Sequence, residues 1–423
     1  MANEFNKEER VAFEDLLEGF DDALVLSRMV SKYDIGDVEA ERGSDTVWRP
    51  VPYIAQSFSG LDQSSNFGDS MQLSVPATIG TVQSSHFALT ATELRDGLQE
   101  NRLAKAARQK LASDINVAVM NTAANEGTVF VQRTGAASGF SDVAECDAAF
   151  NELGIEMDMR HLALSSRDYN NMASDLAGRE TMNGKPTRAY ERAYVGEVAG
   201  FDTYKLDYAN SLTAAAGVTV TINGADQYYT PVATTTSANG INKTNTDNRY
   251  QTITIGVSSG TVKVGDAFTI AGVNSVHHIT KADTGQLKTF RIHEIVTGAG
   301  GAGTVKISPP IISAEGATDA EEQYKNVTAT PATGAAITFL NIAAASVNPF
   351  WRYDAIELLP SKLIMPANSG MATMSATTDQ GVTVLMSRQA AIGTMKVQYR
   401  LDVMFGTVCT NPEMAGLMMF AQT

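Results

Sequence analysis

The stretch that most constrains the fold of this chain runs from Thr90 to Gly127. Thr90, followed three residues later by Glu93, predicts a capping box that starts a helix. Asn125 and Gly127 predict a left-handed stop at the other end. A helix of roughly 35 residues, at about 1.5 Å per residue, is about 50 Å long. Such a helix spans a whole domain.

The apolar residues of this helix change face along its length. Leu94 and Leu98 share one face. Another face carries Ala104, Ala107, Leu111, Ile115 and Ala118. No heptad pattern persists for the three or four repeats that a coiled coil requires. A crossover helix in an α/β enzyme remains an alternative, but we expect a spine helix that several layers contact.

The composition and charge of the 423 residues limit the classes of protein to which the chain can belong. Their 43% hydrophobic and 19% charged residues are typical of a folded chain with several domains. The net charge of -15 argues against a nucleic-acid-binding surface, which needs clustered Lys and Arg. Two cysteines are too few for a disulfide framework, and no run approaches the ~20 apolar residues of a membrane helix. We expect a chain that is made and kept in a cytoplasm.

The first residues predict an amphipathic helix. Asn6 caps it, and apolar residues then recur at helical spacing at Phe13, Leu16, Leu17, Phe20 and Leu24. The opposite face is acidic and carries Glu8, Glu9, Glu14, Asp15 and Glu18. Such a face is either simply solvated or a docking arm for a basic partner.

Residues 47–86 predict a long hairpin, with two extended segments joined by the turn-rich stretch 59–70. Pro50, Pro52 and Pro76 suit edge strands, because proline cannot donate a hydrogen bond to a ladder. An isolated two-stranded hairpin is marginally stable in water. We therefore expect this hairpin to rest on a neighbouring subunit.

Short helices and strands follow the spine. Ser141 predicts the start of a helix that Gly154 closes, and this helix places Cys146 on its buried face as a small core residue. A strand over 161–165, a helix over 166–176 and a third helix around 190–194 are expected next. Near the end of the chain, residues 395–405 alternate with a period of two. This alternation predicts a long half-buried strand lying along the spine helix.

An all-β insertion is predicted between about residues 217 and 345, where helical periodicity disappears. Six alternating runs bounded by turn residues occupy 218–223, 251–257, 266–273, 289–296, 304–308 and 335–340. They indicate a small antiparallel barrel or sandwich. The polar stretches 234–248 and 273–287 are expected to be long functional loops.

The sequence predicts no catalytic, cofactor-binding or metal site. Residues 298–303 satisfy G-x-G-x-x-G, but a strand-like segment follows, which favours a hairpin turn over a dinucleotide site. His277 and His278 are adjacent, so on a strand they would point to opposite faces and not chelate together. The remaining histidines, His86, His161 and His293, have no Cys or Glu at ligand spacing.

With these segments in order, the chain resembles the major coat proteins of short-tailed double-stranded-DNA phages of Salmonella and Shigella, which share the Hong Kong 97 capsid fold. Short motifs carry the resemblance, at residues 46–51, 94–96, 106–112, 199–202, 247–250, 350–351 and 354–356. Each motif alone is weak. Their shared order, with an all-β insertion in the same interval, is much more specific.

The resemblance implies an α+β Hong Kong 97-type capsid fold with a spine helix, a peripheral sheet, an extended hairpin and an axial domain, plus an inserted six-stranded antiparallel β-barrel. It also implies domain boundaries. These are an N-terminal arm over 1–32, a peripheral domain over 33–139 (hairpin 48–88, spine 90–126) completed by 393–423, an axial domain over 140–216 and 346–392, and the insertion over 217–345.

The function that the resemblance implies is that of a major capsid protein and not an enzyme. Such a protein self-assembles into an icosahedral phage shell, first as a procapsid around a scaffolding protein and then as an expanded, DNA-filled capsid. The expected partners are copies of itself in hexamers and pentamers, the scaffolding protein, the portal protein and double-stranded DNA contacted without sequence specificity. No cofactor or membrane is expected, and assembly in the host cytoplasm yields the virion capsid.

The resemblance implies three sets of contact residues. The scaffolding-docking candidates are Glu14, Asp15 and Glu18; the inter-capsomer loop candidates, within 237–248, are Asn239, Asn242, Lys243 and Asp247; the intersubunit hairpin candidates are Phe58, Leu61 and Phe67. In the loop, hydrogen bonds are expected to replace the family's acidic ion pairs. The alternative is a phage or cell-surface module whose β domain recognises carbohydrate, for which the insertion offers Tyr228, Tyr229 and Tyr250.

Overall fold

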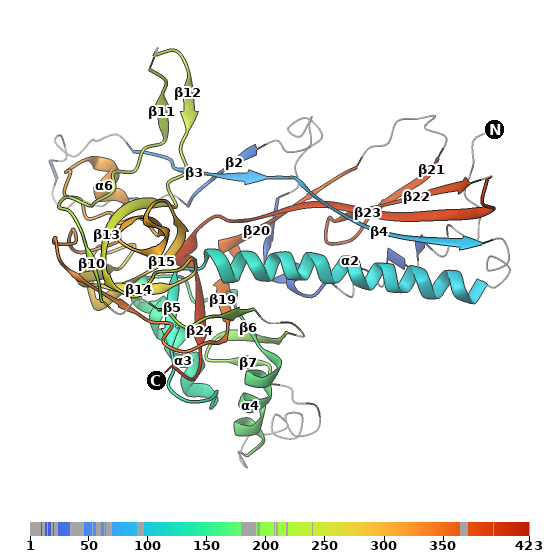
Figure 1. Cartoon of the computed structure of the whole chain (residues 1–423), viewed down its shortest axis with the longest axis horizontal. Coiled ribbons are helices and arrows are strands. Elements are labelled where there is room, and N and C mark those ends of the chain that lie inside the picture. Colours follow the sequence, from blue (N-terminus) through green and yellow to red (C-terminus); the bar gives the residue numbers. More distant parts are fainter. Residues whose placement is uncertain are drawn as a thin grey trace. The chain divides into compact units, whose positions relative to one another are not determined.

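The structure, a computed structural model, describes most of the chain. The described residues are 24–33, 46–52, 70–90, 97–178, 195–206, 210–216, 219–238, 240–363, 371–391 and 393–422, with single positions within 10–20 and 54–64 and at 192 and 208. They form an α+β protein, as predicted (Figure 1). The chain divides into two compact units. Unit 1 is Met1–Val47, Ala77–Thr122 and Ile356–Val408, and unit 2 is Trp48–Pro76, Ala123–Ala355 and Cys409–Thr423.

One sheet dominates unit 1 and joins segments from opposite ends of the sequence. Its order is β1-β20-β23-β22-β21, and β4 also pairs with β23. The strands are β1 (Ser31–Lys32), β4 (Thr81–Thr90), β20 (Ile356–Ser361), β21 (Ala372–Thr377), β22 (Thr383–Ala391) and β23 (Lys396–Cys409). β23 pairs with β4 from Lys396 opposite Thr90 to Phe405 opposite Thr81.

This pairing corrects two predictions. Residues 81–86 were assigned to the hairpin, but β4 belongs to the sheet of unit 1. β23 was expected to be half-buried throughout, whereas residues 401–406 are buried on both faces. The alternation predicted from sequence holds at the start of the strand, where Tyr399 is buried and Arg400 is exposed.

The spine helix is α2 (Gly97–Glu126), and its unit 1 part runs beside β4 and β23 (Figure 1). The Thr122 hydroxyl donates to the Thr407 hydroxyl at 2.8 Å. Ala107, Leu111 and Ile115 are buried as predicted, and Ala104 and Ala118 are half-buried. Residues 91–96 lie outside the described part of the chain, so the capping box remains a prediction.

The end of the helix shows why a glycine stands at position 127. Gly127 does not have the positive φ that a left-handed stop requires, so that prediction was wrong. A Cβ atom there would lie 2.9 Å from the carbonyl oxygen of Ala123 and 3.1 Å from the carbonyl carbon of Ala415. The glycine is needed because two backbone segments approach it closely.

The N-terminal segment agrees with an amphipathic helix at the positions that are described. Residues 10, 13, 14, 16, 17 and 20 are helical. Phe13, Leu16 and Phe20 are buried, whereas Glu14 is exposed. The chain continues into a short 3-10 helix, η1 (Leu26–Met29), where the backbone N–H of Leu26 donates to the side chain of Asn116 on α2 at 3.2 Å.

Unit 2 contains a second six-stranded sheet with helices packed against it. Its order is β5-β24-β19-β6-β8-β7. The strands are β5 (Val129–Gln132), β6 (Arg160–Leu164), β7 (Glu197–Val198), β8 (Phe201–Lys205), β19 (Asn348–Arg352) and β24 (Ala415–Met419), and the helices are α3 (Phe140–Leu153) and α4 (Ser166–Ala177). Phe150, Phe201 and Phe350 form an aromatic cluster in the core between them, with ring centroids 4.9–6.1 Å apart.

The two helices test the predicted caps. The N-cap of α3 is Gly139, two residues before the predicted cap at Ser141, because the carboxylate of Asp142 accepts from the backbone N–H groups of Ser138 and Gly139 at 2.6 and 3.2 Å. Gly154 closes α3 with a φ of 80°, as predicted. Cys146 is fully buried on this helix, also as predicted. The third helix, expected around 190–194, falls outside the described residues except for Arg192, which is helical.

The inserted segment forms a closed six-stranded barrel, so this prediction is confirmed. The order is β10-β13-β16-β15-β14-β17. The strands are β10 (Thr219–Ile222), β13 (Gln251–Ser259), β14 (Ala267–Val276), β15 (Asp283–Ile295), β16 (Gly303–Ser308) and β17 (Ala336–Phe339), one for each predicted run. A short η3 helix (Gly298–Gly300) turns the chain between β15 and β16, where the glycine-rich motif was assigned to a hairpin turn.

Both polar stretches that were expected to be loops are mainly hairpins. β14 and β15 pair as far as Val276 opposite Asp283, which leaves only a short turn at residues 277–282. Residues 234–248 form the pair β11 (Thr234–Thr236) and β12 (Lys243–Asn245). Further short elements are β9 (Ser211–Leu212), β18 (Ala345–Ser346), α6 (Asp319–Tyr324), η4 (Tyr353–Ala355) and η5 (Pro412–Met414).

The predicted extended hairpin is represented by β2 (Thr46–Pro50) and β3 (Ser74–Thr78), which pair with each other. The part next to the turn-rich stretch packs on its own chain: Leu73, just before β3, is buried with Ile312 and Tyr324. The Tyr324 hydroxyl also donates to the carbonyl oxygen of Met71 at 2.9 Å. The expectation that nothing in the same chain covers the hairpin was therefore wrong for residues 71–73.

Candidate assembly interface

The hairpin β11–β12 projects from the barrel (Figure 1). Its turn is held by its own hydrogen bonds: the backbone N–H of Ser237 donates to the carbonyl oxygen of Asn242 at 2.8 Å, and the N–H of Asn242 donates to the Ser237 hydroxyl at 3.0 Å. Asn242 and Lys243 are exposed, and Ile241 between Gly240 and Asn242 is 77% exposed. The hairpin therefore presents polar groups and one apolar side chain to solvent.

Asp247 lies at the base of this hairpin. Its carboxylate forms an ion pair with Arg249 at 2.8 Å, and Arg249 also donates to the carbonyl oxygen of Cys409 at 3.0 Å. Asp247 thus has a partner in its own chain, whereas Lys243 is exposed and has no ion pair among the described residues. Asn239, the remaining loop candidate, lies outside the described residues.

The other two candidate sets are described only in part. Glu14 is exposed on the helical N-terminal segment, while Asp15 and Glu18 lie outside the described residues. Leu61 is fully exposed, while Phe58 and Phe67 lie outside the described residues. The structure therefore places one acidic and one apolar candidate on the surface.

The barrel holds the end of the spine helix through Arg291 on β15. This side chain is buried, and it donates to the carbonyl oxygens of Ala124 and Gly127 at 2.5 and 3.1 Å. These carbonyls are among those that a helix leaves without an internal partner at its C-terminus, where a cation is favourable. Burial lowers the pKa of Arg291 to about 10, against the opposing effect of Glu126. The guanidinium therefore remains charged at neutral pH.

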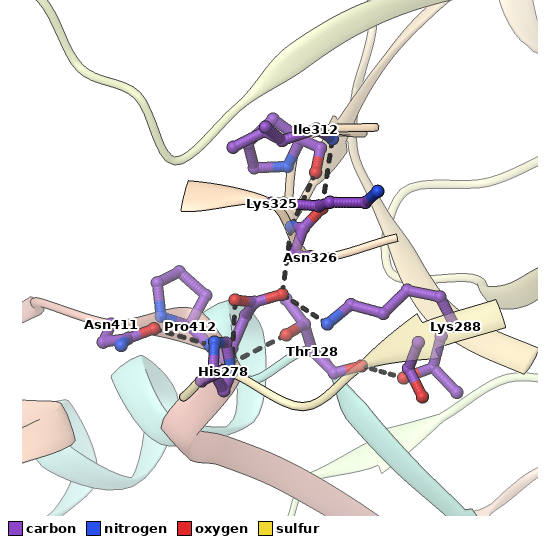
Figure 2. Close-up of polar contacts among 12 residues, drawn as sticks. Thr128, His278, Lys288, Ile312, Lys325, Asn326, Asn411 and Pro412 are labelled. Atoms are coloured by element: carbon purple, nitrogen blue, oxygen red, sulfur yellow. Dashed lines mark hydrogen bonds and ion pairs between the residues drawn. The ribbon is translucent and has the colours of Figure 1, made fainter. Parts of the chain in front are cut away.

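A buried polar cluster, which we call the Glu413 centre, joins the barrel to the C-terminal segment (Figure 2). It consists of Glu413 on η5, Lys288 on β15, His278 and Asn326. Lys288 and Glu413 form a close ion pair. The Asn326 amide donates to the Glu413 carboxylate at 3.1 Å, and the His278 Nε2 atom lies 3.5 Å from it. Burial alone would raise the pKa of Glu413, but Lys288 and His278 together lower it.

Further hydrogen bonds fix the geometry around this centre. The Thr128 hydroxyl donates to the carbonyl oxygen of Pro412 at 2.8 Å, and the N–H of Glu413 donates to the Asn411 side chain at 3.1 Å. The side-chain Oδ1 atom of Asn326 accepts from the backbone N–H of Ile312 at 3.0 Å. Figure 2 shows Lys288, Asn326 and His278 converging on the Glu413 carboxylate, with these further hydrogen bonds around it. The arrangement is that of a structural joint, since Lys288 and Asn326 hold the Glu413 carboxylate, while the His278 Nε2 atom makes no hydrogen bond.

Sequence reasoning missed the Glu413 centre. Its members extend from His278 to Glu413, 135 positions apart, and no local pattern links them. The expectation for the paired histidines was also wrong in its premise, because His277 and His278 lie in the turn after β14 and not on a strand. The isolated acidic residue in Asn411–Pro412–Glu413, within an otherwise apolar C-terminal segment, was the one local signal.

The described residues give little support for metal binding or for a cysteine nucleophile. They contain no group of three or more His, Cys, Asp or Glu side chains arranged to hold a metal ion. Burial raises the pKa of the Cys146 and Cys409 thiols, which opposes their use as nucleophiles. Across the same residues, no helix combines the length and apolar character needed to cross a membrane.

Two of the three tyrosines considered for carbohydrate binding, Tyr229 and Tyr250, are engaged within the chain. The Tyr229 hydroxyl donates to Asn248 at 3.0 Å, and the Tyr250 hydroxyl donates to Glu126 at 2.5 Å. Lys306 lies over the Tyr250 ring, 4.7 Å from its centroid. These two rings serve packing and hydrogen bonding inside unit 2.

Comparisons with known proteins identify the family. The chain matches the sequence model described as P22 coat protein - gene protein 5 over residues 1–421. It is 45% identical to the solved CUS-3 coat protein I-domain, with 29% of this chain and 96% of that chain covered and a TM-score of 0.23. A chain from Mycobacterium phage Che8 is 8% identical, with 93% and 90% covered and a TM-score of 0.44. The capsid of cyanophage P-SCSP1u is 10% identical, with 95% and 89% covered and a TM-score of 0.41.

The last two similarities are distant, and the family match carries the assignment. That match spans nearly the whole chain, so it confirms the resemblance on which the predictions of a Hong Kong 97-type fold and a capsid role depend. The chain therefore belongs to the P22 coat protein family, and it is a major capsid protein that forms an icosahedral phage shell.

Proposed function

We propose that this coat protein first builds a precursor shell around an internal scaffolding protein in the host cytoplasm, and that the shell then expands around packaged double-stranded DNA. The observation that carries the proposal is the family match over residues 1–421. Copies of the chain form hexamers and pentamers, and a portal protein joins the shell. The chain has no enzymatic role in this scheme.

The proposal assigns a role to each segment. Residues 1–32 form a scaffolding-docking arm, 33–139 with 393–423 a peripheral domain, 140–216 with 346–392 an axial domain, and 217–345 the inserted domain. The exposed β11–β12 hairpin makes contacts between capsomers, and the tip of the extended hairpin, with Leu61 exposed, lies on a neighbouring subunit. Many modest contacts of this kind sum to a stable shell.

The charge of the chain supports an enclosure role for the shell. A net charge of -15 gives weak repulsion between protein and DNA phosphates. Weak repulsion lets the genome slide during packaging and ejection without sequence-specific contacts.

The central experiment mixes the purified chain with a scaffolding protein and images the product by electron microscopy. Closed particles of uniform size are expected, with the scaffolding protein inside. A chain that stays a monodisperse monomer under all such conditions would contradict the proposal.

Reversing one charge on the arm tests the docking role. Asp15→Lys is expected to block scaffold-directed assembly, because a basic partner segment is repelled by the new charge. Glu14→Lys, at an exposed position, is expected to act in the same direction. Particle yield by sedimentation measures the effect, and circular dichroism checks the fold.

A matched control for the arm is Glu152→Lys, which makes the same charge change at an exposed position on α3. It is expected to assemble as the natural chain does. An unchanged particle yield for both arm variants would remove the docking proposal.

Deleting residues 239–246 tests the inter-capsomer hairpin. The deletion removes the turn and β12 but none of the six barrel strands. It is therefore expected to weaken contacts between capsomers, so that particles dissociate at a lower denaturant concentration, while the barrel keeps its stability. Particles that survive to the same concentration as the natural shell would show that the hairpin has no such role.

A further inference from the structure

The adjacent histidines His277 and His278 have no place in the shell function, yet they stand at a junction inside unit 2. Their turn, residues 277–282, joins β14 to β15 at one end of the barrel. The backbone N–H of His278 donates to the carbonyl oxygen of Leu153, at the end of α3, at 2.9 Å. The N–H of Val276 donates to the carbonyl oxygen of Asn326 at 3.1 Å. Hydrogen bonds therefore hold the turn from two sides.

His277 covers the end of α3. A Cβ atom on Gly154 would lie 2.4 Å from the Cε1 atom of His277, so the imidazole fills the space above this glycine. The Nδ1 atom of His277 accepts from the backbone N–H groups of Ile279 and Thr280 at 3.2 Å each. These hydrogen bonds fix the orientation of the ring over the glycine.

His278 faces the Glu413 carboxylate. The charged and titratable groups that act on it are Glu413 from η5, Lys288 from β15, and Lys281 and His277 from its own turn. Lys325, at the end of α6, lies beside Lys281. Glu413 already has a close partner in Lys288, and its distance of 3.5 Å from the His278 Nε2 atom exceeds that of a good hydrogen bond. A charged His278 would therefore stand beside several cations, with one shared carboxylate to offset them.

Solvent can reach this junction. A cleft of 310 Å³ is lined by His278 and Glu413 and also by Ile279 and Pro412. The His278 side chain is 12% exposed, so it is mostly buried but not sealed from water. Protons can thus reach the imidazole when the turn opens slightly.

We infer that the His277–His278 turn is a proton-sensitive clamp that fastens the barrel to α3 and η5 at neutral pH and releases them in acid. When the turn opens, His278 takes up a proton. The positive charges of Lys288 and Lys281 then oppose the return of the protonated imidazole to its buried position. The barrel strands stay folded during this opening. The inference concerns a single chain and does not depend on how the shell assembles.

The direction of the pH effect follows from the two states of His278. Burial, with smaller contributions from Lys288 and Lys281, lowers the pKa of the clamped imidazole to about 4, although Glu413 acts in the opposite direction. The ordinary value of 6.5 applies when the turn is open. Because the pKa of His278 is lower in the closed state than in the open state, the closed state is favoured above pH 6.5. This stabilisation of the closed state is lost as the pH falls toward 4.

Hydrogen–deuterium exchange on the full chain at pH 7.5, 6 and 5 tests the clamp. Protection factors corrected for the chemical exchange rate are expected to fall on the order of tenfold between pH 7.5 and 5 in residues 276–282 and 410–415. The barrel strands β13 and β16 are expected to keep their protection. His278→Gln is expected to remove most of this pH dependence.

His86→Gln is the matched control, because His86 is exposed on β4 in unit 1. It is expected to respond to pH as the natural chain does. A fall of the same size in His278→Gln, no fall in the natural chain, or a parallel loss of protection in β13 and β16 would each overturn the inference. A titration of the histidine resonances of the natural chain needs no variant: a His278 pKa close to 6.5 in the folded chain would also overturn it.

Discussion

Replacing Glu413 with alanine is expected to destabilise unit 2 by about 3–5 kcal/mol, because Lys288 is then left as a buried cation without its partner. Lys288 is 4% exposed, so water cannot take over the lost interaction. Asn326 and His278 also lose the carboxylate that they contact. Urea unfolding at pH 7.5, followed by the fluorescence of the buried Trp351, measures the change as a shift of the midpoint.

Two controls separate the ion pair from a general effect of truncation. Glu145→Ala removes a carboxylate that is 58% exposed and paired with Arg133, and it is expected to cost less than about 1 kcal/mol. The double variant Glu413→Gln with Lys288→Met removes both charges, and it is expected to cost less than the sum of the single changes. A cost below about 1 kcal/mol for Glu413→Ala would mean that this pair does not hold the joint.

Replacing Arg291 with methionine is expected to cost about 3 kcal/mol, because buried carbonyl groups at the end of α2 then lose their donor. The methionine keeps much of the side-chain volume, so the loss comes from the hydrogen bonds to Ala124 and Gly127 and not from a cavity. The expected local effect of Arg291→Met is faster amide hydrogen exchange in the last turn of α2. Hydrogen exchange and urea unfolding measure the local and the overall effect.

Arg291→Lys is expected to fall between the natural chain and the methionine variant, since one ammonium cannot reproduce the planar fork of the guanidinium. Arg167→Met, at an exposed position on α4, is the matched control and is expected to change stability by no more than about 0.5 kcal/mol. If Arg291→Met matches this control, then the barrel does not support the spine through this residue.

Elements that depend on local pattern were predicted well from the sequence. Each of the six alternating runs became a barrel strand, because a strand with one face in a core needs apolar residues at every second position. The spine helix is present, with Ala107, Leu111 and Ile115 buried as its periodicity indicated. The helix caps at Gly154 and near Ser166 also depend on neighbouring residues, so they could be predicted from the sequence.

Errors occurred where the partner of a segment is distant in the chain. β4 was assigned to the hairpin because nothing in residues 81–90 says that β23 is its neighbour. Residues 273–287 looked like a loop because much of this two-stranded extension is polar, although its backbone groups still pair. Gly127 was assigned a left-handed conformation, whereas its role is to admit the backbone of Ala415.

The sequence by itself determined the elements, the six barrel strands and, through the order of its motifs, the coat protein family. The tertiary structure alone decided which elements meet: Arg291 on the end of the spine, Lys288 on Glu413, and the two histidines over α3 and η5. Local periodicity reflects which face of an element is buried. It carries no information about the distant group that a buried charge needs, and only the folded chain supplies that group.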